Sequence, residues 1–202
     1  MTQFGTIITG AAPEAGMVAT LKLWLPSYIS EVERQTGRTA GTVARPRSYR
    51  TAVEPDNWPE DQLPAVIVLA GGLEAEPSRE GPRSYRTWFD LRVATIVSAS
   101  TEVAARSVAQ LYAAAIRSAA LQHPSLGSKV DALDWQGETY EAAGQDRNRT
   151  IAASVVEFRA MIASVTEGWA GPQGAPQVDP VAPYPEQPTV LTTPVTVTKL
   201  AI

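Results

Sequence analysis

The stretch Leu63-Pro64-Ala65-Val66-Ile67-Val68-Leu69-Ala70-Gly71-Gly72 decides the fold. It is a short, continuous run of apolar side chains closed by two glycines. A run of this length bounded by turn residues is typical of a strand buried on both faces, whereas a half-exposed strand alternates. We therefore expect a buried strand over residues 63–69 and a turn at Gly71-Gly72.

Farther along the chain, apolar and polar side chains alternate with the period of two that marks a strand with one covered face. In residues 88–98, Phe89, Leu91, Val93 and Val97 share one face, and Asp90 and Arg92 share the other. In residues 150–165, Val156, Phe158, Ala160 and Ile162 oppose Val155, Glu157, Arg159 and Met161. Further strands are expected at 129–140 and within 39–53, with turns at Gly137 and Gly144.

Two segments carry the helical period instead. The first begins near Pro13, ends near Gly37, and repeats Val18, Leu21, Leu25, Ile29 and Val32. Pro26 lies inside it and predicts a kink or a break into two short helices. The second follows Ser100, a suitable N-cap, and stops at Pro124. Its expected buried stripe is Ala104, Val108, Leu111, Tyr112, Ala115, Ile116 and Ala119.

The resulting order, α-β-β-β-α-β-β, predicts an α+β domain over residues 1–167. The simplest arrangement is an approximately five-stranded, mostly antiparallel sheet with two main helices packed on one face, because each helix then buries one stripe. Such a sheet has two edges, and an uncovered edge is prone to pairing with another chain.

Residues 168–202 differ from the rest, since they hold seven of the 16 prolines. Proline lacks a backbone N–H and fixes φ, so this part predicts an extended C-terminal arm. The arm ends in a β-prone segment containing Val190, Val195 and Val197. We interpret it as an arm that docks on a neighbour; the alternative is a floppy tail.

Composition limits the chemistry available to the chain. Its 202 residues include 17 basic and 21 acidic side chains, one histidine and no cysteine. The net charge of −4 argues against a general nucleic-acid binder. Disulfides, zinc–cysteine sites and thiol nucleophiles are excluded. Neither a membrane span nor a secretory signal is apparent, and we expect no catalytic residue, no metal and no cofactor.

The candidates for chemistry have simpler structural explanations. The single histidine, His123, falls at the end of the second helix, where a structural role in which it interacts with the helix dipole is favoured over a role as a base. Neither a Gly-x-Ser-x-Gly elbow nor a Walker-type loop is present. Asp131, Asp134 and Glu138 lie on an expected strand and are more simply explained as a polar surface than as a divalent-ion site.

One hexapeptide occurs twice. Pro46-Arg47-Ser48-Tyr49-Arg50-Thr51 is repeated as Pro82-Arg83-Ser84-Tyr85-Arg86-Thr87. Each copy lies at or just before an expected strand. Around the first copy, arginines are the only charged residues, which gives a basic edge on an acidic protein. We take Arg47, Tyr49, Arg50, Arg83, Tyr85 and Arg86 as interface candidates; the alternative is a solvated edge protected by charge.

Together these elements resemble a known family. The order of the elements is similar to that of tail terminator proteins of long-tailed bacteriophages, particularly those of actinobacteria. The elements are an N-terminal amphipathic helix, the stretch from Leu63 to Gly72, the strand Phe89–Thr95 and the helix opened by Ser100-Thr101-Glu102. The resemblance covers about residues 10–165. The arm and the repeated hexapeptide are not part of it.

The resemblance implies a structural virion protein without an active site, assembled in the host cytoplasm. Its subunits would form a hexameric ring that caps the tail tube, stops its growth and offers a docking surface to the head connector. The implied partners are other copies of the chain, the tail tube protein and the connector or stopper; DNA would pass through the lumen without specific binding. The alternatives are another neck component, such as a head–tail stopper, adaptor or completion protein, and a small cytoplasmic enzyme or ligand-binding domain.

Overall fold

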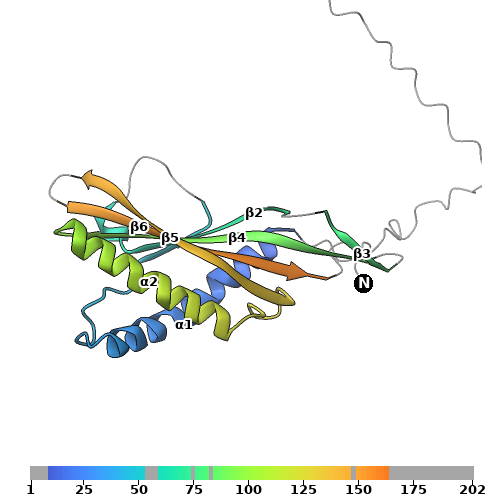
Figure 1. The fold of residues 1–202 in the computed structure, drawn as a ribbon, viewed down its shortest axis with the longest axis horizontal. Helices are drawn as coiled ribbons and strands as arrows, with labels where there is room; N and C mark the ends of the chain where they lie inside the picture. Colours follow the sequence, from blue (N-terminus) through green and yellow to red (C-terminus); the bar gives the residue numbers. More distant parts are fainter. Residues whose placement is uncertain (1–8, 53–58, 74–75, 82–83, 147–148, 164–202) are drawn as a thin grey trace, which may run out of the picture.

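The computed structural model describes residues 9–52, 59–73, 76–81, 84–146 and 149–163. The elements, in chain order, are α1 (Ala11–Gln35), β1 (Ser48–Arg50), the short 3-10 helix η1 (Glu60–Gln62), β2 (Ala65–Leu73), β3 (Ser78–Gly81), β4 (Ser84–Ala99), α2 (Glu102–Gln122), β5 (Ala132–Asp146) and β6 (Arg149–Ile162). Both helices lie on the same side of one sheet (Figure 1). The predicted α+β class is confirmed. The predicted arm lies outside the described residues.

The strands form one six-stranded sheet in the order β1-β2-β4-β6-β5, with β3 paired to β4 off this path. β1 runs parallel to β2, and every other neighbouring pair is antiparallel. The long strands β4 and β6 occupy the centre and pair continuously from Thr87 opposite Ile162 to Ala99 opposite Thr150. β6, the last strand in sequence, thus separates β4 from β5.

The core lies between the sheet and the helices. The predicted alternation is confirmed in both central strands: Phe89, Leu91, Val93 and Val97 of β4 are buried, as are Val156, Phe158, Ala160 and Ile162 of β6. From α2, Tyr112, Ala115, Ile116 and Ala119 are buried as expected, together with Ala105, Ala109, Ala113 and Ala120. The first half of the predicted stripe is displaced, because Ala104, Val108 and Leu111 are only partly buried. Small alanines at the contact let α2 approach the sheet closely.

Of the kink or break predicted at Pro26, the break does not occur, because α1 continues as a single helix of 25 residues. Proline at this position removes the hydrogen bond to the Lys22 carbonyl. The side chain of Lys22 is exposed, so water can reach that part of the helix. Pro13 lies in the first turn, where its missing N–H would have had no partner within the helix.

Other boundaries also differ from the sequence expectations. Within 39–53 only Ser48–Arg50 is a strand. The N-cap of α2 is Thr101 and not Ser100, since the Thr101 hydroxyl accepts a hydrogen bond from the Ala104 N–H at 3.2 Å.

The glycines expected to mark turns lie inside strands. Gly71 and Gly72 fall in β2, at a register shift between Ala70 and Leu73, so the strand continues through them. Gly137 and Gly144 likewise sit at register shifts of β5. Bulges of this kind bend a strand without ending it, and glycine is well suited to them.

Candidate interaction surfaces

The two edges of the sheet differ greatly in length. β1 supplies three residues at one edge, and β5 supplies 15 at the other. Within the described ranges, no strand pairs with the outer side of β5. A row of unpaired backbone N–H and C=O groups of this length is a template for pairing with another chain.

The β1 edge is basic. Between Gln35 and Val53 the only charged residues are Arg38, Arg45, Arg47 and Arg50, which we call the basic edge. Arg38 donates to the Ser107 hydroxyl at 2.8 Å, and Arg45 lies 3.6 Å from the buried Glu33 carboxylate. The side chain of Arg47 is exposed, while its backbone N–H donates to the Pro64 carbonyl at 2.8 Å. Of these four arginines, Arg45 is the one that lies against the buried Glu33 carboxylate.

Tyr49, predicted as an interface residue, is partly buried against α1. Its hydroxyl donates to the Leu21 carbonyl at 3.5 Å, and the Lys22 ammonium lies 5.8 Å from its ring centroid. Burial raises the pKa of Tyr49 to about 12. The ring thus anchors β1 on the helix layer, and its contact with a neighbouring molecule stays a prediction.

The second copy of the hexapeptide lies in a different part of the sheet. Tyr85 and Arg86 begin β4, opposite Arg79 and Ser78 of β3. Arg50 pairs with Ile67, which pairs with Ala94, eight residues farther along β4 than Arg86. At 3.3–3.4 Å per residue this separates the two copies by roughly 27 Å. They do not form one surface. Arg83, Val190, Val195 and Val197 lie outside the described residues.

The β5 edge is acidic. From Val130 to Asp146 the sequence contains no lysine or arginine, and its acidic side chains include Asp131, Asp134, Glu138 and Glu141, which we call the acidic edge. Asp134 lies 3.3 Å from Arg159, and Glu138 lies 2.9 Å from Arg117. Asp131 and Glu141 are exposed. Of the residues predicted to form a polar surface on a strand, Asp134 and Glu138 lie on β5 at the edge of the sheet, and Asp131 immediately precedes the strand.

An aromatic group accompanies this edge on the helix side. The Arg117 guanidinium lies 4.8 Å from the ring centroid of Trp135, which is 44% exposed. The Tyr140 hydroxyl donates to Glu138 at 2.5 Å, and burial raises the pKa of Tyr140 to about 12, with the Glu138 carboxylate adding to the shift. Exposed Trp, Tyr and Arg side chains are typical of protein interfaces.

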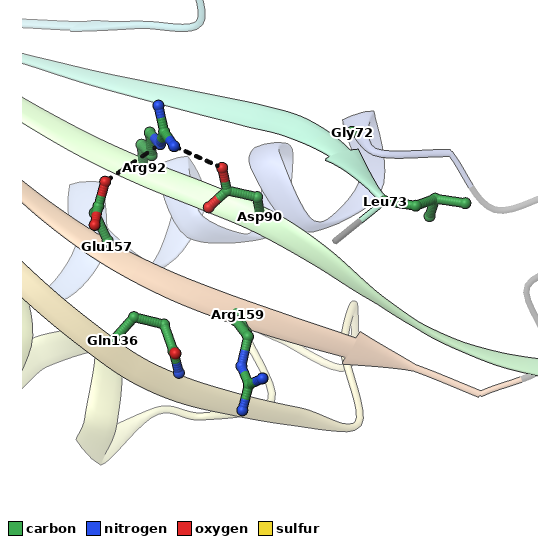
Figure 2. A pocket seen from close by; sticks show the side chains of 7 residues that line it. All are labelled: Gly72, Leu73, Asp90, Arg92, Gln136, Glu157 and Arg159. Atoms are coloured by element: carbon green, nitrogen blue, oxygen red, sulfur yellow. Dashed lines mark ion pairs between the residues drawn. The ribbon is translucent and has the colours of Figure 1, made fainter. Parts of the chain in front are cut away.

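The uncovered face of the sheet carries a shallow hollow of about 340 Å³, shown in Figure 2. Arg92 lies 3.2 Å from Asp90 and 3.4 Å from Glu157, so it links two carboxylates across neighbouring strands. Arg159 packs its guanidinium 4.8 Å from the ring centroid of Trp88. These charges neutralise one another, and the hollow is a network of ion pairs rather than a site with a single reactive group.

A second hollow, of about 370 Å³, lies between α1 and the turn after α2. His123 caps α2 there and stacks on Trp24, with ring centroids 4.5 Å apart, while Tyr28 meets it edge-on at 6.3 Å. These contacts give His123 a packing role between the two helices.

Outside these surfaces, Glu60 of η1 forms an ion pair with Arg149 of β6. In the ranges that the structure covers, no group of three or more His, Cys, Asp or Glu side chains is placed to hold a metal. Neither described helix combines the length and apolarity needed to cross a membrane.

Glu33 is a buried carboxylate that no motif in the sequence marks. It is 1% exposed and accepts hydrogen bonds from the backbone N–H groups of Val43 and Gly41 at 2.6 and 3.1 Å. The only signal in the sequence was its place on the helical stripe next to Val32, where a carboxylate needs a partner. Its role is to hold the loop that leads to the basic edge.

No protein-family model matches the chain, and no curated protein matches it. Among solved structures it is similar to a chain of "Virion of native gene transfer agent (GTA) particle", with a TM-score of 0.43 and 15% sequence identity, over 77% of this chain and 94% of that one. A similarity at this level carries no functional conclusion.

Proposed function

We propose that this chain is a structural protein of a phage-type virion, one subunit of a hexameric ring that caps the tail tube, stops its growth and presents a docking surface to the head connector. The observation that carries the proposal is the long outer edge of β5, a 15-residue strand with no partner on that side within the described ranges. The resemblance in element order to tail terminator proteins gives the proposal its specific form.

A closed ring needs a head-to-tail contact, so every subunit must offer two different and complementary surfaces. The two edges of this sheet are different surfaces, because they differ in length and in charge. Strand addition at an edge supplies main-chain hydrogen bonds without demanding any special side chain. The segment Val190–Leu200 is proposed to pair with a neighbouring subunit or an adjacent ring. A net charge of −4 suits a lumen that DNA passes without binding.

The proposal is tested by adding the purified chain to growing tail tubes and imaging the tubes. We expect rings at one end of each tube and an arrest of growth. Binding to the head side of tubes that are already capped would instead identify a stopper, adaptor or completion protein. A chain that binds neither tubes nor capsids overturns the proposal.

The arm is tested separately with a chain that lacks residues 168–202. We expect this variant to cap tubes poorly or to lose the connector. Unchanged ring formation and unchanged docking would contradict the proposed pairing of the arm and leave the capping role intact.

A further inference from the structure

The two edges of the sheet carry charges of opposite sign. The basic edge (Arg38, Arg45, Arg47 and Arg50) lies at and before β1, and the acidic edge (Asp131, Asp134, Glu138 and Glu141) lies at β5. The strand order β1-β2-β4-β6-β5 places them at opposite ends of the same sheet. A second copy of the chain can therefore present its basic edge to the acidic edge of the first, and its own acidic edge remains available for a third.

We propose that the subunit contact is this meeting of unlike edges: the basic edge of one copy docks along β5 of the next. The inference rests on the proposed ring and specifies which surfaces form it. Because the two surfaces differ, the contact is head-to-tail and leads to a ring or a filament, whereas a self-complementary patch leads only to a dimer.

The charges that remain unpaired within the subunit support this choice of partner. On the acidic edge, Arg159 and Arg117 partly neutralise Asp134 and Glu138. Asp131, whose carboxylate accepts a hydrogen bond from the Ala163 N–H at 2.8 Å, and Glu141 are both exposed, and neither forms a salt bridge with another described residue. On the basic edge, Glu33 is buried and faces Arg45, while Arg47 points its side chain into solvent. Each edge thus keeps an excess of one sign for a partner.

Docking at β5 would be stabilised by backbone hydrogen bonds and aromatic contacts as well as by charge. Its outer backbone groups carry no strand partner among the described residues, and the exposed Trp135 beside Arg117 offers an aromatic anchor at the same edge. Anchors of this type contribute most of the energy in many interfaces, whereas complementary charge fixes orientation and partner choice.

Charge reversal provides the test. Arg47→Glu reverses a charge on the basic edge, and Glu141→Arg reverses one on the acidic edge; both side chains are exposed. Arg106→Glu, at an exposed position of α2, changes the net charge as Arg47→Glu does but lies on neither edge. Association of the whole chain is measured by sedimentation and native mass spectrometry, in solution and on tail tubes.

Each single reversal is expected to weaken association about tenfold or more, since like charges then face each other across the contact. The Arg106→Glu variant is expected to behave as the wild type. An equimolar mixture of Arg47→Glu and Glu141→Arg restores assembly, because an alternating ring places unlike charges at every contact. Raising the salt from 0.1 to 1 M shortens the screening length from about 10 to 3 Å and is expected to weaken the wild-type contact.

The possible failures are distinguishable. Rings that form equally well with either reversal overturn the inference and leave the capping role standing. Occupation of β5 by residues 190–200 of a neighbour would be one reason for that result. A wild-type chain that stays monomeric, both alone and on tubes, overturns the inference too. Rings with the expected charge dependence that never engage a tube support the contact and contradict the proposed function.

Discussion

The Oε1 atom of Glu33, near the end of α1, accepts a hydrogen bond at 2.6 Å from the backbone N–H of Val43, which lies in the loop between α1 and β1. The other carboxylate oxygen accepts from the Gly41 N–H at 3.1 Å, and Arg45 lies 3.6 Å away. Val43 is itself 2% exposed and belongs to the core. One buried carboxylate on α1 thus fixes the loop from which the basic edge begins.

Replacing Glu33 by Gln is expected to lower the free energy of unfolding by about 1–3 kcal/mol, because an amide N–H₂ group then faces a backbone N–H and one donor loses its acceptor. Urea unfolding followed by circular dichroism measures the loss. Glu31→Gln is the matched control, since Glu31 pairs with Arg34 in solvent one turn of helix away from the loop, and no resolvable change is expected. Equal stability of the two variants would show that the buried carboxylate does not hold the loop.

The same carboxylate predicts a pH dependence. The Val43 N–H, more than any other group, holds the pKa of Glu33 below its ordinary value of 4.5, with help from Gly41, Arg45 and Thr42 and against the opposing effect of burial. Because the pKa is depressed in the folded state, the stabilisation is complete above the unfolded value and is lost as the pH falls through the folded one. The difference in unfolding free energy between wild type and Glu33→Gln should be constant near neutral pH and shrink in acid. A difference that is equal at pH 7 and in strong acid contradicts this assignment.

The strands with one covered face were predictable from sequence because a period of two directly reports which side chains meet the helices. In β6, every second residue from Thr150 to Ile162 is buried, as the alternation indicates. The turn predicted at Gly71-Gly72 was wrong because glycine is typical of both turns and bulges. Only the pairing of β2 with β4 distinguishes the two. β3 was missed because its four residues are stabilised by β4 and carry no apolar pattern of their own.

The candidate surfaces were predictable only in part. The run of arginines around Arg47 and the acidic residues around Asp134 are visible in the sequence as local charge. Their placement at opposite edges depends on β6, which enters the sheet between β4 and β5 and pairs with β4 residues 51 to 75 positions earlier, from Thr150 with Ala99 to Ile162 with Thr87. Such long-range pairing leaves no local signature. The same holds for Arg117 with Glu138, which meet across two elements.

Phe158 tests the assignment of the covered face. Its ring is fully buried, and Phe158→Ala is expected to lower the free energy of unfolding by about 3–5 kcal/mol through lost burial and the cavity left behind. Val155→Ala, on the other face of the same strand where the side chain is only partly buried, should lose about 1 kcal/mol or less. Chemical denaturation of both variants makes the comparison. A loss well under 1 kcal/mol for Phe158→Ala would contradict the assignment of this face of β6 to the core.

Gly16 tests how rigidly α1 is seated on the turn that follows α2. A Cβ atom at this position would lie 2.8 Å from the Leu126 carbonyl oxygen and 2.9 Å from the Lys129 Cβ, and both neighbours belong to a turn in which Leu126, Gly127 and Ser128 have positive φ. In the interior of a helix, alanine is ordinarily more stabilising than glycine by about 1 kcal/mol. Here the clash is with backbone in a conformation that tolerates little movement, so Gly16→Ala is expected to be net destabilising by about 1–3 kcal/mol.

Gly72→Ala is the control, because its Cβ would meet nothing within 4 Å, and a change in the free energy of unfolding within about 0.5 kcal/mol is expected. Thermal and urea unfolding measure the stability of the two variants. A gain of stability in Gly16→Ala would show that the turn can move away from α1, and would contradict a rigid contact between α1 and residues 126–129.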